Sequence, residues 1–379
     1  MAKRQITIAG GGAAGLTAAV TAARLGARVT VLERADRVGK KILKTGNGRC
    51  NLTNTAVAPD AYNAPDFATP ALTGTGCAGL RHFFDTLGLL TYADAEGRVY
   101  PVSDAASSVL DVLRLSCEEY GVRTLCGFDA ARVLPDGTVC AADGRTVPGD
   151  AVIVATGGGT TLLKSAGHRV VPFLPVLCPL KTDTAPIRGL SGVRVKCAAT
   201  LLRGGRAVVT LRGELLFRDY GVSGIVVFDL SRYARPGDVL SLDLLPDVPL
   251  EAFCQLLAAR KTAHPARGGE AFLTGMFHSR VSAALLRAAG GTSPEALARA
   301  VKGFSLTVEG CGDVKQAQVT RGGAALDAFD PATLRSRLQP NLYAAGEVLD
   351  IDGKCGGYNL HWAFASGILA AKSAMEAQV

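Results

Sequence analysis

Three glycines near the N-terminus have the spacing of a phosphate-binding turn. They are Gly10, Gly12 and Gly15, in the order Gly-x-Gly-x-x-Gly, directly after a short apolar segment. The first permits a tight turn, the second lets the backbone approach a pyrophosphate, and the third lets a helix lie close to a strand. The N–H groups of Ala13 and Ala14, at the start of that helix, can bind phosphate oxygens. This pattern predicts a dinucleotide site.

An acidic residue follows at the position where such a site needs one. The apolar segment ARVTVLE, residues 27–33, reads as a second strand and ends on Glu33, 18 residues after Gly15. A carboxylate at this point accepts hydrogen bonds from the ribose hydroxyls, whereas a 2′-phosphate needs a cation. Glu33 therefore favours NAD or FAD over NADP, and we include the neighbouring Arg34 among the predicted cofactor contacts. A glycine turn without a ligand would leave Glu33 unexplained.

A second polar segment, LKTGNGRCNLTN at residues 43–54, is too rich in glycine and asparagine to belong to a core. Glycines allow a close approach of the backbone to a ligand, and asparagine side chains can bind phosphate or ring oxygens. Arg49 can either offset ligand charge or brace the loop. The segment reads as part of a binding site.

Two later segments distinguish FAD from NAD. GDAVIVATGGG, residues 149–159, is a strand that runs into Ala155-Thr156-Gly157. Near the C-terminus a strand ends in Gly346-Glu347, an acidic loop follows, and Gly-Gly-Tyr-Asn opens a last helix. Together these segments resemble the glutathione-reductase-like FAD proteins, in which the last helix points its N-terminus at the flavin. No second complete Gly-x-Gly-x-x-Gly unit with a following acid occurs, so we expect NAD(P)H to bind only transiently.

Five segments in order along the chain resemble the BaiN-like family of FAD-dependent oxidoreductases. They are GKKILKTGNGRCNLTN, GRVYPVSDAASSVLDVL, GELLFRDYGVSG, AQVTRGG and GEVLDIDGKCGGYNLHWAFASG. The best-defined activity of that family is reduction of ring double bonds in 3-oxo-4,6-dienoyl bile acids. The chain departs from the family pattern after Gly159, where a glycine loop is shortened. The resemblance implies cofactor contacts at Lys41, Thr45, Gly46, Asn47, Gly48, Arg49, Cys50, Asn51, Ala155, Thr156, Gly157, Gly346, Glu347, Asp352, Gly357, Tyr358, Asn359 and Leu360.

The strands and helices expected around these residues indicate an α/β fold. We expect a Rossmann-like FAD-binding domain of glutathione-reductase type, formed by residues 1–165 and 310–379. An inserted β-rich unit is expected at 166–246, with a hairpin at Gly204-Gly205, and an inserted helical unit at 247–309. Within the latter, LEAFCQLLAARK and SPEALARAVKGF read as helices, the second with Ser293 as N-cap. Such an insert would cover the flavin and shape the substrate pocket.

The amino-acid composition restricts the kinds of partner that we expect the chain to bind. The 379 residues contain 41 Lys and Arg against 33 Asp and Glu, a net charge of +8, without a basic block of five or more. Nucleic acid is therefore the least favoured partner and a small-molecule substrate the preferred one. Ten scattered cysteines without a C-x-x-C pair indicate a reducing, cytoplasmic location and no zinc site. No apolar run suggests a membrane span, and the oligomeric state is left open.

Four side chains are candidates to donate a proton or orient a substrate carbonyl: Tyr220, Ser223, Tyr358 and His361. The preferred function is NAD(P)H-driven reduction of an activated C=C in a small apolar substrate, such as a 3-oxo-4-ene steroid or bile acid. One alternative is a flavin oxidase or dehydrogenase of a small amine or alcohol. The other is an RNA-associated flavoprotein.

Overall fold

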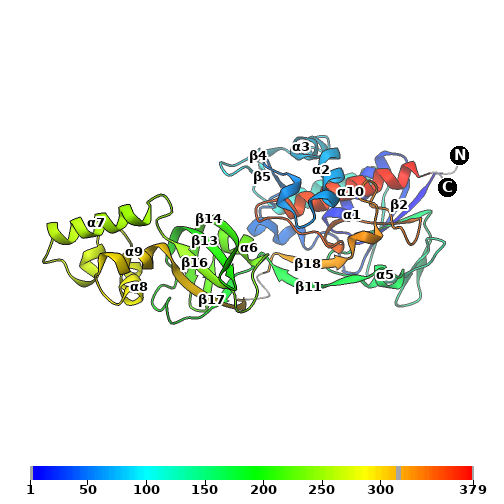
Figure 1. Cartoon of the computed structure of the whole chain (residues 1–379). Helices are drawn as coiled ribbons and strands as arrows, with labels where there is room; N and C mark the ends of the chain where they lie inside the picture. The colour runs from blue at the N-terminus through cyan, green and yellow to red at the C-terminus, as the bar shows by residue number, and fades with distance from the viewer. Residues whose placement is uncertain (1–2, 313–316, 378–379) are drawn as a thin grey trace. The chain divides into compact units, whose positions relative to one another are not determined.

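The computed structural model describes residues 3–312 and 317–377. The chain divides into two compact units. The first, the nucleotide-binding unit, consists of Met1–Leu174 and Val319–Val379, and the second, the barrel unit, of Pro175–Gln318 (Figure 1). Each unit has its own hydrophobic core.

A parallel sheet forms the centre of the nucleotide-binding unit. Its strand order is β19-β10-β1-β2-β6, and each neighbouring pair is parallel. Strands β1, β10 and β19 are largely buried apolar runs, as expected of a parallel sheet covered on both faces, whereas the edge strand β6 is mostly exposed. Its strands are β1 (Gln5–Ala9), β2 (Arg28–Glu33), β6 (Arg123–Cys126), β10 (Ala151–Val154) and β19 (Leu342–Ala344).

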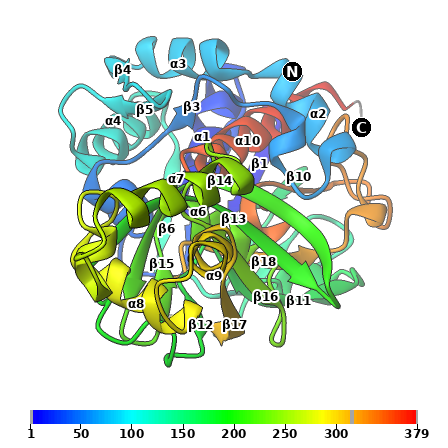
Figure 2. The ribbon, with the colours of Figure 1, turned by 60° about the vertical axis from the view of Figure 1, so that its left-hand side comes forward.

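Helices α1 and α10 lie side by side in this unit (Figure 2). Their backbones approach closely, since a Cβ added at Gly367 of α10 would lie 2.4 Å from the carbonyl oxygen of Ala14. At the start of α1, a Cβ at Gly15 would lie 1.8 Å from the carbonyl oxygen of Gly10. The third glycine of the motif thus permits the close packing that the sequence predicted. The helices of the unit are α1 (Ala13–Arg24), α2 (Pro65–Gly74), α3 (Cys77–Asp85), α4 (Ala106–Glu119), α5 (Thr161–Ser165) and α10 (Tyr358–Glu376), with 3-10 turns η1 (Ile42–Gly48), η2 (Pro59–Ala61), η5 (Leu326–Ala328) and η6 (Gly346–Val348).

Smaller sheets surround the parallel one. An antiparallel sheet of order β3-β5-β4 carries the end of the Gly/Asn-rich segment, and β7-β8-β9 connects β6 to β10. A further pair joins β11 to β18. These strands are β3 (Thr53–Asn54), β4 (Thr91–Ala93), β5 (Arg98–Pro101), β7 (Ala130–Val133), β8 (Val139–Ala141), β9 (Thr146–Val147), β11 (Val170–Val176) and β18 (Val319–Ala324).

The barrel unit is built on a closed antiparallel barrel of order β12-β15-β14-β13-β16-β17. Its longest strands form a hairpin whose turn residues, Gly204 and Gly205, have φ of 55° and 77°, which confirms the predicted turn. The barrel strands are β12 (Leu180–Thr182), β13 (Arg194–Arg203), β14 (Arg206–Arg218), β15 (Gly221–Ser223), β16 (Val239–Asp243) and β17 (Phe304–Cys311). The helices are α6 (Ile225–Ser231), α7 (Leu250–Ala263), α8 (Ser279–Ala289) and α9 (Pro294–Lys302), with the 3-10 turn η3 (Gly269–Leu273).

The predicted helices exist, and the Ser293 hydroxyl accepts a hydrogen bond from the Ala296 N–H at 3.5 Å. The division expected between a β-rich unit (166–246) and a helical unit (247–309) is not seen. Helix residues such as Leu257 and Leu297 share one core with barrel strands, and β17 returns to the barrel after the helices. Helical periodicity shows that a segment has an apolar face, but not what that face packs against.

Candidate functional site

The glycine turn and Glu33 meet at the carboxyl ends of the parallel strands. The Glu33 carboxylate accepts hydrogen bonds from the N–H groups of Gly11, at 2.9 Å, and Ala35, at 2.8 Å. No side chain caps the start of α1, and a Cβ at Gly12 would meet no atom within 4 Å. The first turn of α1 therefore offers N–H groups beside open space, the arrangement that suits a phosphate. Arg34, next to Glu33, is exposed.

Glu347, in the 3-10 turn η6 that follows β19, contacts three other segments of the unit. Its Oε1 accepts hydrogen bonds from the N–H and the hydroxyl of Thr320, both at 2.9 Å, and its Oε2 pairs with Lys41. A Cβ at Gly157 would lie 3.7 Å from the same carboxylate, so the turn after β10 lies beside it. In that turn the Thr156 hydroxyl donates to the carbonyl oxygen of Gly159. The predicted residues after β10 and β19 are thus brought together.

The Gly/Asn-rich segment winds tightly. After the kink at Thr45, both Gly46 and Asn47 have φ near 55°, and Cys50 has φ of 59°. Cys50 is fully buried, and burial raises the pKa of its thiol to about 11, so it stays protonated at neutral pH. This protonated state disfavours a nucleophilic role.

Asn51 is the most informative residue of this segment. Its side chain is 8% exposed, and its Oδ1 has no hydrogen-bond partner among the described residues. A Cβ at Gly357 would lie 2.7 Å from this oxygen, so Asn51 lies against the start of α10. A buried amide oxygen without a partner costs free energy unless a ligand satisfies it. Asn51 therefore fits a contact to a bound group.

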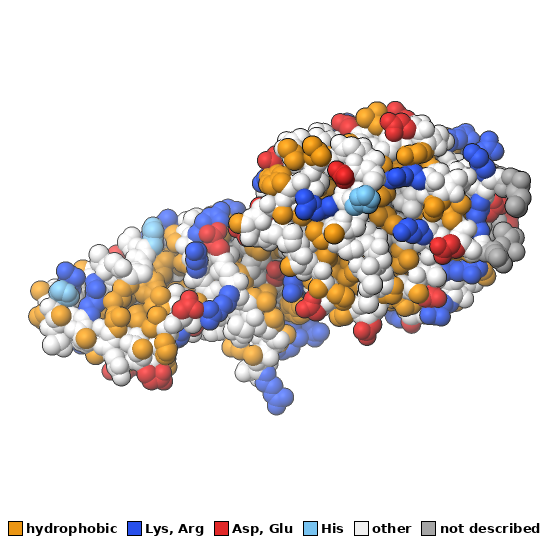
Figure 3. All heavy atoms as spheres, turned by 90° about the horizontal axis from the view of Figure 1, so that it is seen from above, with side chains coloured by type: hydrophobic (Ala, Val, Ile, Leu, Met, Phe, Trp, Pro, Cys, Tyr) orange, Lys and Arg blue, Asp and Glu red, His pale blue; other side chains and the backbone are white. Residues whose placement is uncertain are grey.

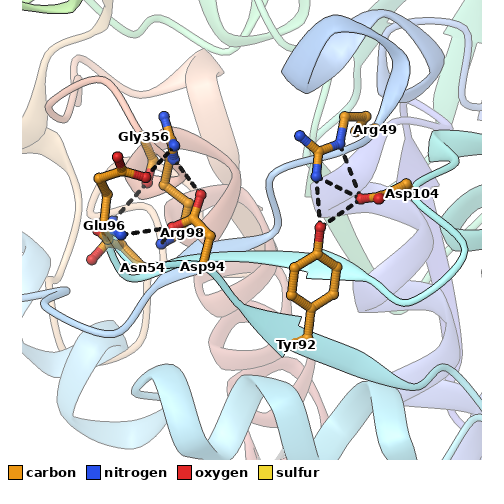
Figure 4. A network of polar contacts seen from close by, with 8 residues as sticks. All are labelled: Arg49, Asn54, Tyr92, Asp94, Glu96, Arg98, Asp104 and Gly356. Atoms are coloured by element: carbon orange, nitrogen blue, oxygen red, sulfur yellow. Dashed lines mark hydrogen bonds and ion pairs between the residues drawn. The ribbon is translucent and has the colours of Figure 1, made fainter.

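The contacts that Arg49 makes within the protein do not favour a direct contact to a bound group. Its guanidinium donates to the Asp104 carboxylate and to the Tyr92 hydroxyl (Figure 4). It also stacks over the Tyr100 ring, at 4.2 Å from the centroid. Of the two roles that the sequence left open for Arg49, the structure favours bracing the loop. Gly48 and Asn47 are exposed beside it.

The acidic loop before α10 is held by buried polar contacts. Asp352 is fully buried and accepts two hydrogen bonds from the Arg321 guanidinium, at 2.7 and 3.0 Å. Asn359 closes the loop, because its Oδ1 accepts from the Gly353 N–H at 2.8 Å and its Nδ2 donates to the Gly353 carbonyl at 3.0 Å. Leu360 packs on the core. Asp352 and Asn359 therefore shape the loop from within.

One hydrogen bond joins the small sheet to the segment before α10. The Asn54 amide donates to the carbonyl oxygen of Gly356 at 3.1 Å, and Arg98 beside it pairs with Asp94 and Glu96 (Figure 4). The Gly/Asn-rich segment and the Gly-Gly-Tyr-Asn segment, about 300 residues apart, thus lie against each other.

Of the proton-donor candidates, His361 is contradicted. Its side chain has no exposed surface, its Nδ1 lies 2.8 Å from the Thr53 hydroxyl, and burial lowers its pKa to about 4. A ring without exposed surface cannot reach a substrate, so His361 braces β3 against α10. Tyr358, the first residue of α10, is partly exposed. Tyr220 and Ser223 belong to the barrel unit, where Ser223 is buried in β15.

Sequence reasoning missed Thr320 and Arg321 as site residues, although the AQVTRGG segment that contains them carried the family resemblance. It also missed Asp104, which lies in a turn with φ of 50°. A carboxylate in a turn carries no sequence signal for a partner more than fifty residues away.

The sequence model of the family described as HI0933-like protein Rossmann domain matches residues 4–373. The chain belongs to this family. The resemblance and the fold class expected from the motifs are thereby confirmed, and this HI0933-like chain is a flavin-dependent oxidoreductase. Among the described residues, no helix is both long and apolar enough to cross a membrane.

Several characterised proteins are similar over their full length. A 3-dehydro-bile acid delta(4,6)-reductase of Clostridium scindens is 37% identical over 98% of this chain and 99% of its own. A ribosomal RNA dihydrouridine synthase of Escherichia coli is 30% identical over 97% and 98%. The solved structure of a 3-ketosteroid-delta4-(5alpha)-dehydrogenase from Rhodococcus jostii has the same fold, with a TM-score of 0.50, 16% identity, and coverage of 99% and 97%.

Proposed function

We propose that this flavoprotein reduces a C=C bond conjugated to a carbonyl group, with NAD(P)H as the electron donor and a 3-oxo-4-ene steroid or bile acid as the substrate class. The similarity to the bile acid reductase over nearly the whole of both chains supports this proposal most directly. Bound FAD would supply hydride transfer, taking electrons from NAD(P)H and delivering them to the β-carbon of the substrate.

The residues fit FAD in three respects. The uncapped start of α1 and the open space at Gly12 would hold the pyrophosphate. Glu33 lies where an adenosine ribose would be held. The buried oxygen of Asn51, beside the start of α10, would hold a polar hydrogen of the cofactor.

The N-terminus of α10 would add an electrostatic contribution. Gly357 is the N-cap of this 19-residue helix and supplies no side-chain cap. A helix N-terminus carries a partial positive charge, which favours a neighbouring negative charge. Lys41 is paired with Glu347, so we assign this pair to holding the loop rather than to binding phosphate.

An anaerobic mixing experiment tests the function. The protein is loaded with FAD, reduced with dithionite, and mixed with a 3-oxo-4-ene steroid while flavin absorbance is followed. Reoxidation with loss of the enone absorbance is expected, and NADH and NADPH are compared as reductants in a parallel run. Flavin that stays reduced with every enone would exclude the ene-reductase proposal.

Ribosomal RNA is a second candidate substrate, and one observation favours it. The Escherichia coli and Haemophilus influenzae proteins named ribosomal RNA dihydrouridine synthase match 97% of this chain, at 30% and 27% identity. The uracil C5=C6 bond is also conjugated to a carbonyl, so the chemistry is of the same class. Incubation with unmodified ribosomal RNA and NADPH, followed by mass spectrometry of nucleosides, tests it. Nucleosides without dihydrouridine would exclude this candidate.

A further inference from the structure

A groove in the barrel unit combines small side chains with positive charge. It has a volume of about 590 Å³ and is lined by α8, α9, and the segments at 185–186 and 303–305. Arg287 and Arg299 line it from the two helices, and its other lining residues are alanine, proline, glycine, phenylalanine and serine. No acidic residue lines it. The groove is thus positively charged, and most of the side chains that line it are small.

Two further arginines, Arg188 and Arg280, lie near Arg287 and extend the positive charge beyond the groove. Arg280 precedes Arg287 by two helical turns, so both lie on one face of α8. Arg280 donates to the carbonyl oxygen of Ser191 at 3.0 Å, and Arg287 donates to that of Arg188 at 3.0 Å. These acceptors are neutral, so the contacts orient the guanidinium groups without neutralising them. Arg188, Arg280 and Arg287 are exposed.

The acidic residue Glu295 lies on α9 near this cluster. Glu295 precedes Arg299 by one turn of α9, and its pKa is lowered first by the hydrogen bond from the Ser293 hydroxyl and, among weaker causes, by Arg299. The carboxylate of Asp243, by contrast, is paired with Lys302. The cluster therefore keeps an excess of positive charge.

The net charge of the whole barrel unit also favours an anionic partner. Residues 175–318 contain 18 Lys and Arg against 12 Asp and Glu, a net charge of +6, whereas the rest of the chain has 23 against 21, a net of +2. Lys and Arg side chains, with Asp and Glu among them, appear on the face shown in Figure 3. A single-sign excess on one unit raises the local concentration of anionic partners.

We propose that the arginine-lined groove between α8 and α9 binds the phosphate backbone of structured RNA. This inference rests on the second candidate function. Guanidinium groups bind phosphate in a forked geometry, and alanine walls let a sugar-phosphate chain come close. A small carboxylate would need one guanidinium fork, whereas the four arginines extend along α8 and beyond the groove, as a polyanion requires.

Salt-dependent RNA binding tests the inference on the full-length FAD-loaded protein. The affinity for a fluorescently labelled ribosomal RNA hairpin is measured by anisotropy across a salt series for Arg287→Ala/Arg299→Ala. The control is Arg194→Ala/Arg212→Ala, which removes the same charge from exposed residues of the same unit that are paired with Glu214 and Asp247. We expect the groove variant to weaken binding by roughly tenfold or more and to reduce the slope of log K against log salt by about 2, one for each phosphate contact. The control should change the slope little.

Equal losses in the two variants, or no loss in either, would overturn the inference, as would a wild-type protein that does not bind the hairpin. The outcome is separable from the second candidate function. If RNA binds through the groove and no dihydrouridine forms, the surface stands and that function fails.

Discussion

Arg49 and Asp104 are joined by two hydrogen bonds across 55 residues of sequence. The Arg49 Nε and Nη2 donate to the same carboxylate oxygen at 3.0 and 2.7 Å, and the Tyr92 hydroxyl donates to that oxygen at 2.8 Å (Figure 4). The hydrogen bonds from Arg49 and Tyr92 lower the pKa of Asp104, so the carboxylate is charged at neutral pH. The Gly/Asn-rich loop is thereby braced by a partner from a second segment that carried the family resemblance, GRVYPVSDAASSVLDVL.

Replacing Asp104 should weaken FAD binding without unfolding the chain. Asp104→Ala is expected to raise the FAD dissociation constant modestly, since the pair is exposed and such pairs are weak. Titration of apoprotein with FAD, followed by fluorescence quenching, measures the effect. The control is Asp111→Ala, which removes another exposed acid, paired with Arg114 on α4. Equal FAD affinity in both variants would mean that Asp104 does not position the loop.

Asn51→Leu should separate ligand binding from stability. The Asn51 oxygen is buried without a partner among the described residues, so leucine removes an uncompensated polar group from the apoprotein. If that oxygen binds FAD, its loss should cost about 1.4 kcal/mol, a roughly tenfold rise in the dissociation constant. The melting temperature of the apoprotein should stay the same or rise. Unchanged FAD affinity would show that the loop has been placed wrongly.

Gly357→Ala should destabilise the chain strongly. The φ of Gly357 is 103°, and a Cβ there would lie 2.5 Å from the carbonyl oxygen of Thr53, a backbone atom that cannot move aside easily. We expect a loss of roughly 2 kcal/mol or more in the free energy of unfolding in urea. Gly121→Ala is the matched control, because its φ is 69° and a Cβ would meet nothing within 4 Å. It should cost about 1 kcal/mol, and equal costs would exclude a steric role at Gly357.

The predictions made from sequence were most accurate for residues whose role depends on their immediate neighbours in the chain. Gly10, Gly15 and Glu33 have the expected places because turn geometry and strand direction follow from adjacent residues. The predictions were poor where a partner is distant. Arg49 could not be assigned to Asp104, nor the apolar faces of the barrel-unit helices to the barrel, since such partners are selected by tertiary packing.

The burial of His361 should make stability fall in acid. The pKa of its ring is about 4 in the folded chain and near 6.5 when unfolded, so between these values the unfolded chain binds more protons. Its contribution is present above pH 6.5 and is lost as the pH falls toward 4, by about 2 kcal/mol at pH 5. Urea unfolding at pH 7 and pH 5 measures the loss. His361→Gln should lose less than wild type over this interval, while His168→Gln, which keeps His361, should retain most of the dependence; identical losses in all three would contradict the assignment.

Tyr358 and Tyr220 remain as candidate proton donors, and paired phenylalanine variants distinguish them. The backbone of Tyr358 is fixed independently of its hydroxyl, because its carbonyl accepts a hydrogen bond from the Tyr62 hydroxyl at 2.8 Å and its ring meets that of Tyr62 edge-on at 6.3 Å. Tyr358→Phe should therefore fold and retain FAD. If its hydroxyl protonates the α-carbon, enone turnover should fall by about 10²- to 10⁴-fold, with flavin reduction by NAD(P)H unchanged. Tyr220→Phe is measured alongside, and full turnover in both variants would require the proton to come from solvent or from another side chain.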